Sequence, residues 1–290
     1  MDLLNLHLYA KSKKGGGSGC GGAGGGGGTD QFAAFLEGTT TDLVVNATSI
    51  KTRALHSHNY LTSITCPVAT SVGQYAFTGS NALRSVDFPK ATLVDTYAFQ
   101  NCGYLTTANL PEVTKLVDSV FYGCSRLTSI NIDSVIEVGT SCFKNCKALT
   151  SVNLSNATIL NQSAFDGCIA LESVSLPKVT TLNAYGFRGC TALKSVEIFA
   201  LSRINSAVFE SCTSLERLII RKTGVCTLID AKAIASTPIT SGTGYVYVPA
   251  AQVDSYKAAT NWSTYASQFR ALEDYTVDGT ITGALDESKI

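Results

Sequence analysis

Apolar residues recur along this chain with a fixed step of 22 residues, and this period predicts its architecture. Leucine follows six residues after each phenylalanine of the repeat, from Leu83 to Leu215, with Leu61 one unit upstream. Because the units follow one another without an insertion, we expect a solenoid in which each unit forms one coil. Phenylalanine marks one position in seven consecutive units, and Leu55 holds that position one unit earlier: Phe77, Phe99, Phe121, Phe143, Phe165, Phe187 and Phe209.

Two further apolar positions in each unit predict a short β-strand. They lie two residues apart, as Val174 and Leu176 do, and two residues is the side-chain period of a strand. Another apolar position, from Val72 to Ile204, begins the return to the next phenylalanine. We therefore expect a parallel sheet of about eight short strands on a concave face and short helical or irregular arcs on the other. Proline, which lacks the N–H that a ladder needs, follows the strand at four places: Pro67, Pro89, Pro111 and Pro177.

The residue two positions after the phenylalanine is expected to adopt a left-handed backbone conformation in most units. Glycine and asparagine dominate this position, and both tolerate a positive φ. The seven residues are Gly79, Asn101, Gly123, Asn145, Gly167, Gly189 and Ser211.

Cysteine occupies the next position in six successive units: Cys102, Cys124, Cys146, Cys168, Cys190 and Cys212. A metal site needs ligands that converge on one point, whereas a ladder points its side chains in parallel. Stacked Cβ atoms lie about 4.8 Å apart and a disulfide needs about 3.8 Å. We expect reduced thiols packed as small apolar groups. Occasional bridges remain the alternative, with Cys142 and Cys226 least bound to the ladder and Cys20 in a glycine-rich segment.

Composition changes along the chain suggest its domain boundaries. We expect a flexible Gly-rich leader at 1–29, an N-terminal cap at 30–50, repeats at 51–222, a C-terminal cap at 223–275 and a polar tail at 276–290. The glycines lack the Lys-Ser/Thr ending of a phosphate-binding loop. Within the C-terminal cap, YVYVP at 245–249 predicts a strand, and the following AAQVDSYKAAT predicts a helix.

Charge and candidate chemistry narrow the classes of function. Lys plus Arg equals Asp plus Glu, 22 each, so the net charge does not favour nucleic acid as a partner. No apolar run is long enough for membrane insertion, and the N-terminus shows no signal peptide. His56 and His58 are interpreted as surface histidines, because two of them without nearby ligands make a weak metal site. No nucleophile motif accompanies them, so we expect no enzyme, no metal and no cofactor.

The outward side of the strands is the expected ligand-binding face. A neighbouring outward row, from Ser63 to Ser195, is also small and polar. The alternative is that small residues stand there because neighbouring coils crowd larger ones, or because their polar groups bond along the stack. The row between the last two apolar positions consists of Thr65, Asp87, Asn109, Asn131, Asn153, Ser175 and Glu197.

The pattern AFxxCxxLxSVxLPxVxxLxxxAF, present at 164–187, resembles the BspA-like leucine-rich repeats of bacterial surface proteins. The segment at 245–269 is similar to the closing segment of such proteins in gut Firmicutes. The resemblance implies a leucine-rich-repeat solenoid of the α/β repeat type, surface adhesion, and binding of a protein or a cell-surface glycan. It implies no catalytic residue.

The N-terminus departs from that family, whose surface members carry a signal peptide. Its Gly-rich leader is similar to those of prophage tail-associated proteins. This resemblance implies a virion-associated protein, or a bacterial surface protein exported without the Sec route, attached to a particle through its N-terminus; otherwise the protein is cytoplasmic. Two functions follow as hypotheses. One is a binding module displayed on a phage tail or bacterial surface, and the other is a structural scaffold or spacer within a larger particle.

Overall fold

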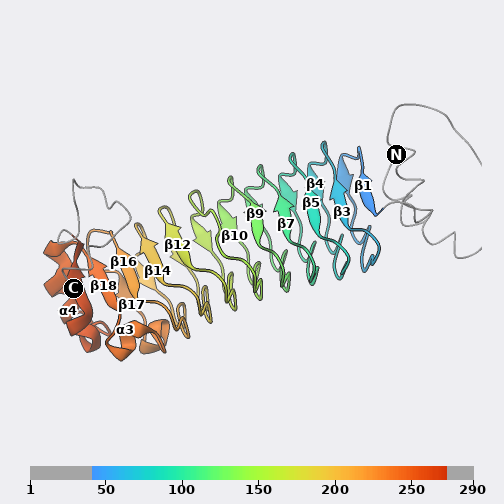
Figure 1. The fold of residues 1–290 in the computed structure, drawn as a ribbon. Coiled ribbons are helices and arrows are strands. Elements are labelled where there is room, and N and C mark those ends of the chain that lie inside the picture. The colour runs from blue at the N-terminus through green and yellow to red at the C-terminus, as the bar shows by residue number, and fades with distance from the viewer. Residues whose placement is uncertain (1–40, 273–290) are drawn as a thin grey trace, which may run out of the picture. The chain divides into compact units, whose positions relative to one another are not determined.

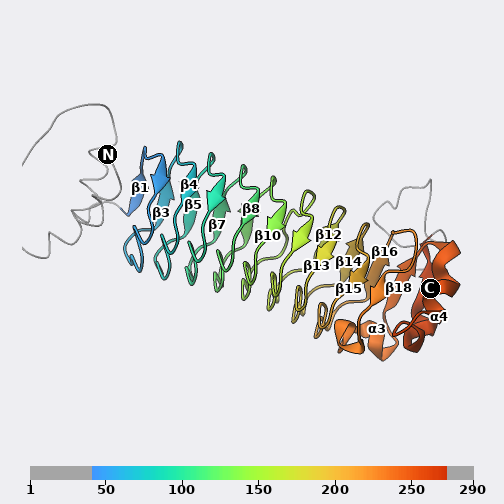
Figure 2. The ribbon, with the colours of Figure 1, turned by 180° about the vertical axis from the view of Figure 1, so that it is seen from behind.

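The computed structural model describes residues 41–272, which form coils of parallel strands and divide into two compact units between Asn153 and Leu154 (Figure 1). The predicted solenoid is confirmed: within each unit, successive coils pair their strands in parallel (Figure 2). The leader at 1–29, most of the cap at 30–50 and the tail at 276–290 lie outside the described residues, as does Cys20.

Most coils contribute a longer strand, here called a face strand, and most also contribute a two-residue return strand. The face strands of unit 1 are β1 (Asp42–Val44), β3 (Ser63–Thr65), β5 (Ser85–Asp87), β7 (Thr107–Asn109) and β9 (Ser129–Asn131). Its return strands are β2 (Ser49–Ile50), β4 (Ser71–Val72), β6 (Leu93–Val94), β8 (Lys115–Leu116) and β10 (Glu137–Val138). The register repeats every coil, since Val86 pairs with Ile64 on one side and Ala108 on the other.

Unit 2 repeats this plan and ends in short helices. Its face strands are β12 (Ser173–Leu176), β14 (Ser195–Ile198), β16 (Arg217–Ile220), β18 (Tyr245–Val248) and β19 (Phe269–Ala271). Its return strands are β11 (Ile159–Leu160), β13 (Thr181–Leu182), β15 (Arg203–Ile204) and β17 (Thr227–Leu228). The helices are η1 (Ala231–Ile234), α3 (Pro238–Ser241), η2 (Ala250–Gln252), α4 (Val253–Ala258) and η3 (Ser263–Gln268).

The arcs that return to each phenylalanine contain turns and the two-residue strands, and residues 41–230 contain no helix. Of the two forms expected for these arcs, the irregular one is therefore found. One expected face strand is also missing, because Val152 and Asn153 belong to no strand. The side-chain alternation survives there without the ladder, since Leu154 is still buried.

Phenylalanine rings stack in a column through the core of each unit. In unit 1 the ring centroids of Phe99 and Phe121 lie 5.3 Å apart, and those of Phe121 and Phe143 lie 5.4 Å apart. In unit 2 the ring centroids of Phe165 and Phe187 lie 5.2 Å apart. The rings are nearly parallel and fully buried, so the prediction that residues 22 positions apart stack in register is confirmed.

The turn around each phenylalanine contains two left-handed residues. The seven positions two residues after the phenylalanine all have φ between 56° and 75°, which confirms the prediction. A second set, two residues before it, was not predicted; it includes Tyr75, Tyr97 and Ser119. Backbone hydrogen bonds to the next coil hold these residues, as when Tyr97 N donates to Asp118 O at 3.2 Å. Hydrogen bonds between coils therefore hold tyrosine in a backbone conformation that this residue type rarely adopts.

The six ladder cysteines are buried and reduced, as expected, and so are Cys142 and Cys226. The ladder thiols also act as hydrogen-bond donors, which the sequence did not indicate. Cys124 Sγ donates to Phe99 O at 3.1 Å, and Cys212 Sγ donates to Phe187 O at 3.1 Å. Ser80, which holds the ladder position in its coil, donates in the same way to Leu55 O. The position selects a small donor and not merely a small apolar group.

Burial of the ladder predicts a loss of stability in alkali. It raises the pKa of the Cys102 thiol from 9.0 to about 12. Above pH 9 the unfolded chain loses this proton while the folded chain keeps it. The free energy of unfolding should therefore fall by about 1.4 kcal/mol per pH unit for each such thiol until the folded pKa is reached. Urea titrations from pH 8 to 10.5 should show a shallower fall for Cys102→Ser than for the wild type; equal slopes would contradict the assignment.

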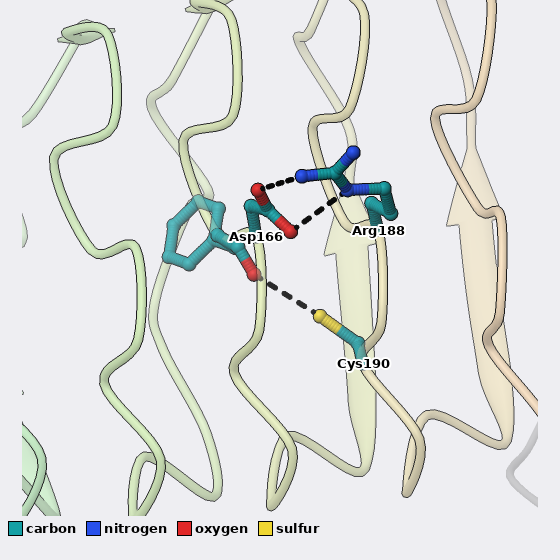
Figure 3. Close-up of polar contacts among 4 residues, drawn as sticks. Asp166, Arg188 and Cys190 are labelled. Carbon is teal, nitrogen blue, oxygen red and sulfur yellow. Dashed lines mark hydrogen bonds and ion pairs between the residues drawn. The ribbon is translucent and has the colours of Figure 1, made fainter.

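One ion pair in unit 2 joins consecutive coils at the turn (Figure 3). Asp166 is 6 % exposed, and its carboxylate accepts two hydrogen bonds from Arg188, from Nε at 3.1 Å and from Nη2 at 2.7 Å. This pairing raises the pKa of the Arg188 guanidinium. The same guanidinium lies over the ring of Tyr185, 4.6 Å from its centroid. These contacts fix the stagger of the two coils.

The C-terminal helices cover the apolar end of the last coil. The indole Nε1 of Trp262 donates to Cys226 O at 2.7 Å, and the Tyr256 hydroxyl accepts from Cys226 N at 2.8 Å. The predicted strand at 245–249 and the helix after Pro249 are both present, as β18 and α4.

Candidate ligand-binding face

Unit 1 places four of the predicted site residues on adjacent strands. Thr65, Asp87, Asn109 and Asn131 lie on β3, β5, β7 and β9, and each is the register partner of the next. All four are half-buried, because the stacked coils cover their inner atoms and leave the tips in solvent. They alternate with buried residues such as Ile64 and Val86, so they point to the outward side of the sheet.

Three of these side chains are joined in a hydrogen-bonded row, here called the amide ladder. Asn109 Nδ2 donates to Asp87 Oδ1 at 2.7 Å, and Asn131 Nδ2 donates to Asn109 Oδ1 at 2.9 Å. Asn131 Oδ1 also accepts from the backbone N of Asp133 at 3.4 Å. The expectation that polar groups bond along the stack is therefore confirmed for these coils. It does not exclude ligand binding, because each amide still has an unused N–H and a lone pair.

Asn153 lies outside the amide ladder. It is exposed, and its Nδ2 donates to Asp133 Oδ1 at 2.8 Å. Asp133 follows β9 in the preceding coil, so Asn153 bonds to the loop after that strand and not to Asn131. The sequence repeat could not show this, because it assumes that every coil keeps the same strand.

The two site residues in unit 2 form a separate pair. Ser175 Oγ donates to Glu197 Oε2 at 3.4 Å, and the Glu197 carboxylate is ion-paired with Arg221 Nε at 2.5 Å. The predicted residues therefore divide into an uncharged row with one aspartate in unit 1 and an ion-paired carboxylate in unit 2. Only the first group offers a mainly neutral hydrogen-bonding surface.

An exposed tyrosine that precedes β7 was not singled out from the sequence. Tyr104 is 42 % exposed, and the guanidinium of Arg126 lies 4.0 Å from its ring centroid. Tyr104 comes three residues before β7, where the other units mostly have alanine. This departure from the repeat was the available signal. An exposed ring offers a ligand a stacking surface.

The histidines form no metal site in the described part of the chain, which contains no cluster of three potential ligands. His56 is exposed, and Ser57 Oγ lies 2.9 Å from its Nδ1. His58 is half-buried, and its Nδ1 accepts from Leu61 N at 3.2 Å. Burial lowers the pKa of His58, so its ring is neutral near pH 7. Its contacts assign it a role in the turn.

No helix within residues 41–272 combines the length and the apolar character needed to cross a membrane.

Comparisons with known proteins identify the repeat. The family model described as the BspA type leucine rich repeat region matches residues 48–161 and 136–246. A search of curated proteins gives no match. A leucine rich cell surface protein from Faecalibacterium prausnitzii is 20 % identical, with 80 % of this chain and 87 % of that chain covered and a TM-score of 0.33. The pneumococcal vaccine antigen PcpA is 12 % identical, with coverages of 79 % and 76 % and a TM-score of 0.47. The T. pallidum leucine rich repeat protein is 20 % identical, with coverages of 61 % and 79 % and a TM-score of 0.39.

Proposed function

Because this chain belongs to the BspA-type leucine-rich repeat family, we propose that it is a non-enzymatic binding module that recognises a protein or a glycan through the outward face of unit 1. We further propose that it is displayed on a phage tail or a bacterial surface. The Gly-rich composition of residues 15–28 is typical of linker sequences, which supports attachment to such a particle.

The amide ladder is the observation that carries the proposal. Its side chains are already ordered by hydrogen bonds between coils, so a ligand does not have to immobilise them. Each amide can offer one donor and one acceptor outward at the spacing of the strands, about 4.8 Å. Such a row suits a neutral ligand with repeated hydroxyl or amide groups. The exposed ring of Tyr104 adds a surface on which a sugar or an aromatic side chain can pack.

The proposal predicts that bulky charges on the amide ladder abolish binding. The double substitution Asn109→Arg/Asn131→Arg should weaken attachment of the fluorescently labelled full chain to bacterial cells and to a glycan array by more than about tenfold. Both sites are on the outward side, so the melting temperature should change little.

A matched control is available on the return side of the same coils. Thr92→Arg/Thr114→Arg places the same charges in one exposed row, 22 residues apart, and should leave attachment unchanged. Retained binding by the Asn109→Arg/Asn131→Arg variant would show that the amide ladder is not the ligand face.

A scaffold or spacer is the second candidate, favoured by the cross-coil contacts that stiffen unit 1. The Lys90–Glu112 pair at 2.6 Å and the Lys115–Glu137 pair at 3.0 Å each join neighbouring coils, in addition to the phenylalanine column. If this function holds, the wild type should bind neither cells nor glycans, and deletion of residues 1–28 should prevent its incorporation into a particle.

A further inference from the structure

Two exposed tyrosines flank one alanine on consecutive coils of unit 1. They occupy the position three residues before the face strands β3, β5 and β7, and we call the three residues the tyrosine site: Tyr60, Ala82 and Tyr104. Backbone hydrogen bonds join the coils in register beside this position. Arg84 N donates to Thr62 O at 2.7 Å, and Thr106 N donates to Arg84 O at 2.8 Å. The two tyrosines therefore stand on either side of the coil that carries Ala82.

Both rings of the tyrosine site project into solvent. Tyr60 is 78 % exposed, and its ring contacts that of His58 in a T-shaped arrangement with centroids 6.3 Å apart. Tyr104 is 42 % exposed, and Arg126, in the following coil, places its guanidinium carbon 4.0 Å from the ring centroid. The guanidinium covers one face of the Tyr104 ring and fixes its plane, so the opposite face is directed toward the coil of Ala82. The site thus offers two ring surfaces, one of them held in place.

The distance between the two tyrosines suits a puckered ring. Residues 22 positions apart lie about 5 Å apart in this stack, as the 4.9 Å between the ring centroids of Tyr75 and Tyr97 shows. Two coils therefore span about 10 Å, whereas a flat aromatic ring in contact with both tyrosines would need about 7 to 8 Å. A saturated sugar ring is thicker and can reach both tyrosines with its axial C–H groups. These groups carry a small positive charge, and the negative face of a tyrosine ring attracts them.

Two cations without an acidic partner border the tyrosine site. Arg84 follows Ala82 by two residues and is exposed, and Arg126 is exposed in the coil beyond. No acidic side chain within residues 41–272 forms an ion pair with either arginine. The neighbours of Arg84 in the adjacent coils, Thr62 and Thr106, are uncharged. A guanidinium in this position favours a ligand that carries a carboxylate.

We propose that the tyrosine site binds an acidic pyranose, a six-membered sugar ring that carries a carboxylate. The ring lies over Ala82 with its C–H faces against Tyr60 and Tyr104, and its carboxylate accepts hydrogen bonds from Arg84. A residue bulkier than alanine at the middle position would occupy the space of the sugar. The tyrosine site includes no residue of the amide ladder, so the inference goes beyond the proposed function, and either can fail without the other.

Saturation-transfer NMR on the full chain tests the ligand class with two matched probes. Methyl β-D-glucuronide carries the carboxylate, and methyl β-D-glucoside has a hydroxymethyl group in its place. The glucuronide should bind about fivefold more tightly than the glucoside, and high salt should remove that difference. Equal affinities at low salt would overturn the assignment of Arg84. Benzoate, a flat anion, should bind more weakly than the glucuronide; equal or tighter binding of benzoate would overturn the sugar.

The substitution Ala82→Leu tests where the sugar lies, with Ala148→Leu as its matched control. Ala148 holds the same position of the repeat three coils later and is half-buried, as Ala82 is. Leucine at 82 should abolish saturation transfer to the glucuronide, and leucine at 148 should leave it unchanged. Both variants should keep the circular dichroism spectrum of the wild type, which separates a blocked site from a lost fold. Undiminished transfer in folded Ala82→Leu would overturn the proposal.

Two further variants separate the charge of the tyrosine site from the amide ladder. Arg84→Ser should lower the affinity for the glucuronide about fivefold and leave the affinity for the glucoside unchanged. Asn131→Ala, in the amide ladder, should change neither affinity. Loss of glucuronide binding in Asn131→Ala would place the sugar on the amide ladder, and the tyrosine site would then be wrong.

Discussion

The substitution Phe121→Ala should lower the free energy of unfolding of unit 1 by about 4 kcal/mol, through lost burial and the cavity left behind. Phe121 is fully buried between two stacked rings, those of Phe99 and Phe143. Each ring contact adds about 0.5 to 1.5 kcal/mol beyond the area buried. Because a coil contacts only its neighbours, the defect interrupts the stack on both sides.

Urea denaturation followed by circular dichroism measures this loss, and Phe199→Ala serves as its control. Phe199 is 37 % exposed, and the guanidinium carbon of Arg221 lies 5.4 Å from its ring centroid. Its truncation should therefore lower the free energy of unfolding by no more than about 1 kcal/mol. The loss of unfolding free energy for Phe121→Leu should lie between those for Phe121→Ala and Phe199→Ala. A cost for Phe121→Ala equal to that for Phe199→Ala would mean that the column does not support the fold.

The phenylalanine column could be predicted because a strict period fixes which residues become neighbours, whatever the details of each coil. The same argument placed Asp87, Asn109 and Asn131 in one outward row. The argument failed where one coil differs from the others. Asn153 belongs to no strand, and only the structure shows that its amide donates to Asp133. A period in sequence reports stacking, and it does not report local shifts of the backbone.

Individual hydrogen bonds could not be predicted from the sequence either. The repeated cysteine predicted a small buried group, but the bond from Cys124 Sγ to Phe99 O depends on the turn that brings that carbonyl within reach. Likewise Tyr75 and Tyr97 gave no sign of a left-handed backbone, because hydrogen bonds to the next coil impose it. Residue preferences describe an isolated turn, whereas here the neighbouring coil decides the conformation.

The substitution Trp262→Ala should destabilise unit 2 by about 4 kcal/mol, because it removes the largest side chain that closes the last coil. The indole is fully buried and meets the rings of Tyr256 and Phe269 edge-on, at 5.9 and 5.6 Å. Its Nε1 also satisfies Cys226 O, so truncation leaves a buried carbonyl without that donor. A solenoid whose end is uncovered exposes the apolar side chains of its last coil to water.

Trp262→Phe separates the two contributions, because it keeps a ring and removes the donor; its cost should be about 1 to 3 kcal/mol. Thiol labelling reports the same event locally. Cys226 is buried, and burial raises the pKa of its thiol to about 12, so it should resist a maleimide in the native wild type at pH 7.5. In Trp262→Ala the maleimide should react with Cys226 before it reacts with the ladder thiols of the earlier coils, because opening begins at the uncovered end. Simultaneous labelling of Cys226 and Cys102 would instead mean that unit 2 does not open locally, and that the indole stabilises the whole chain as one cooperative structure.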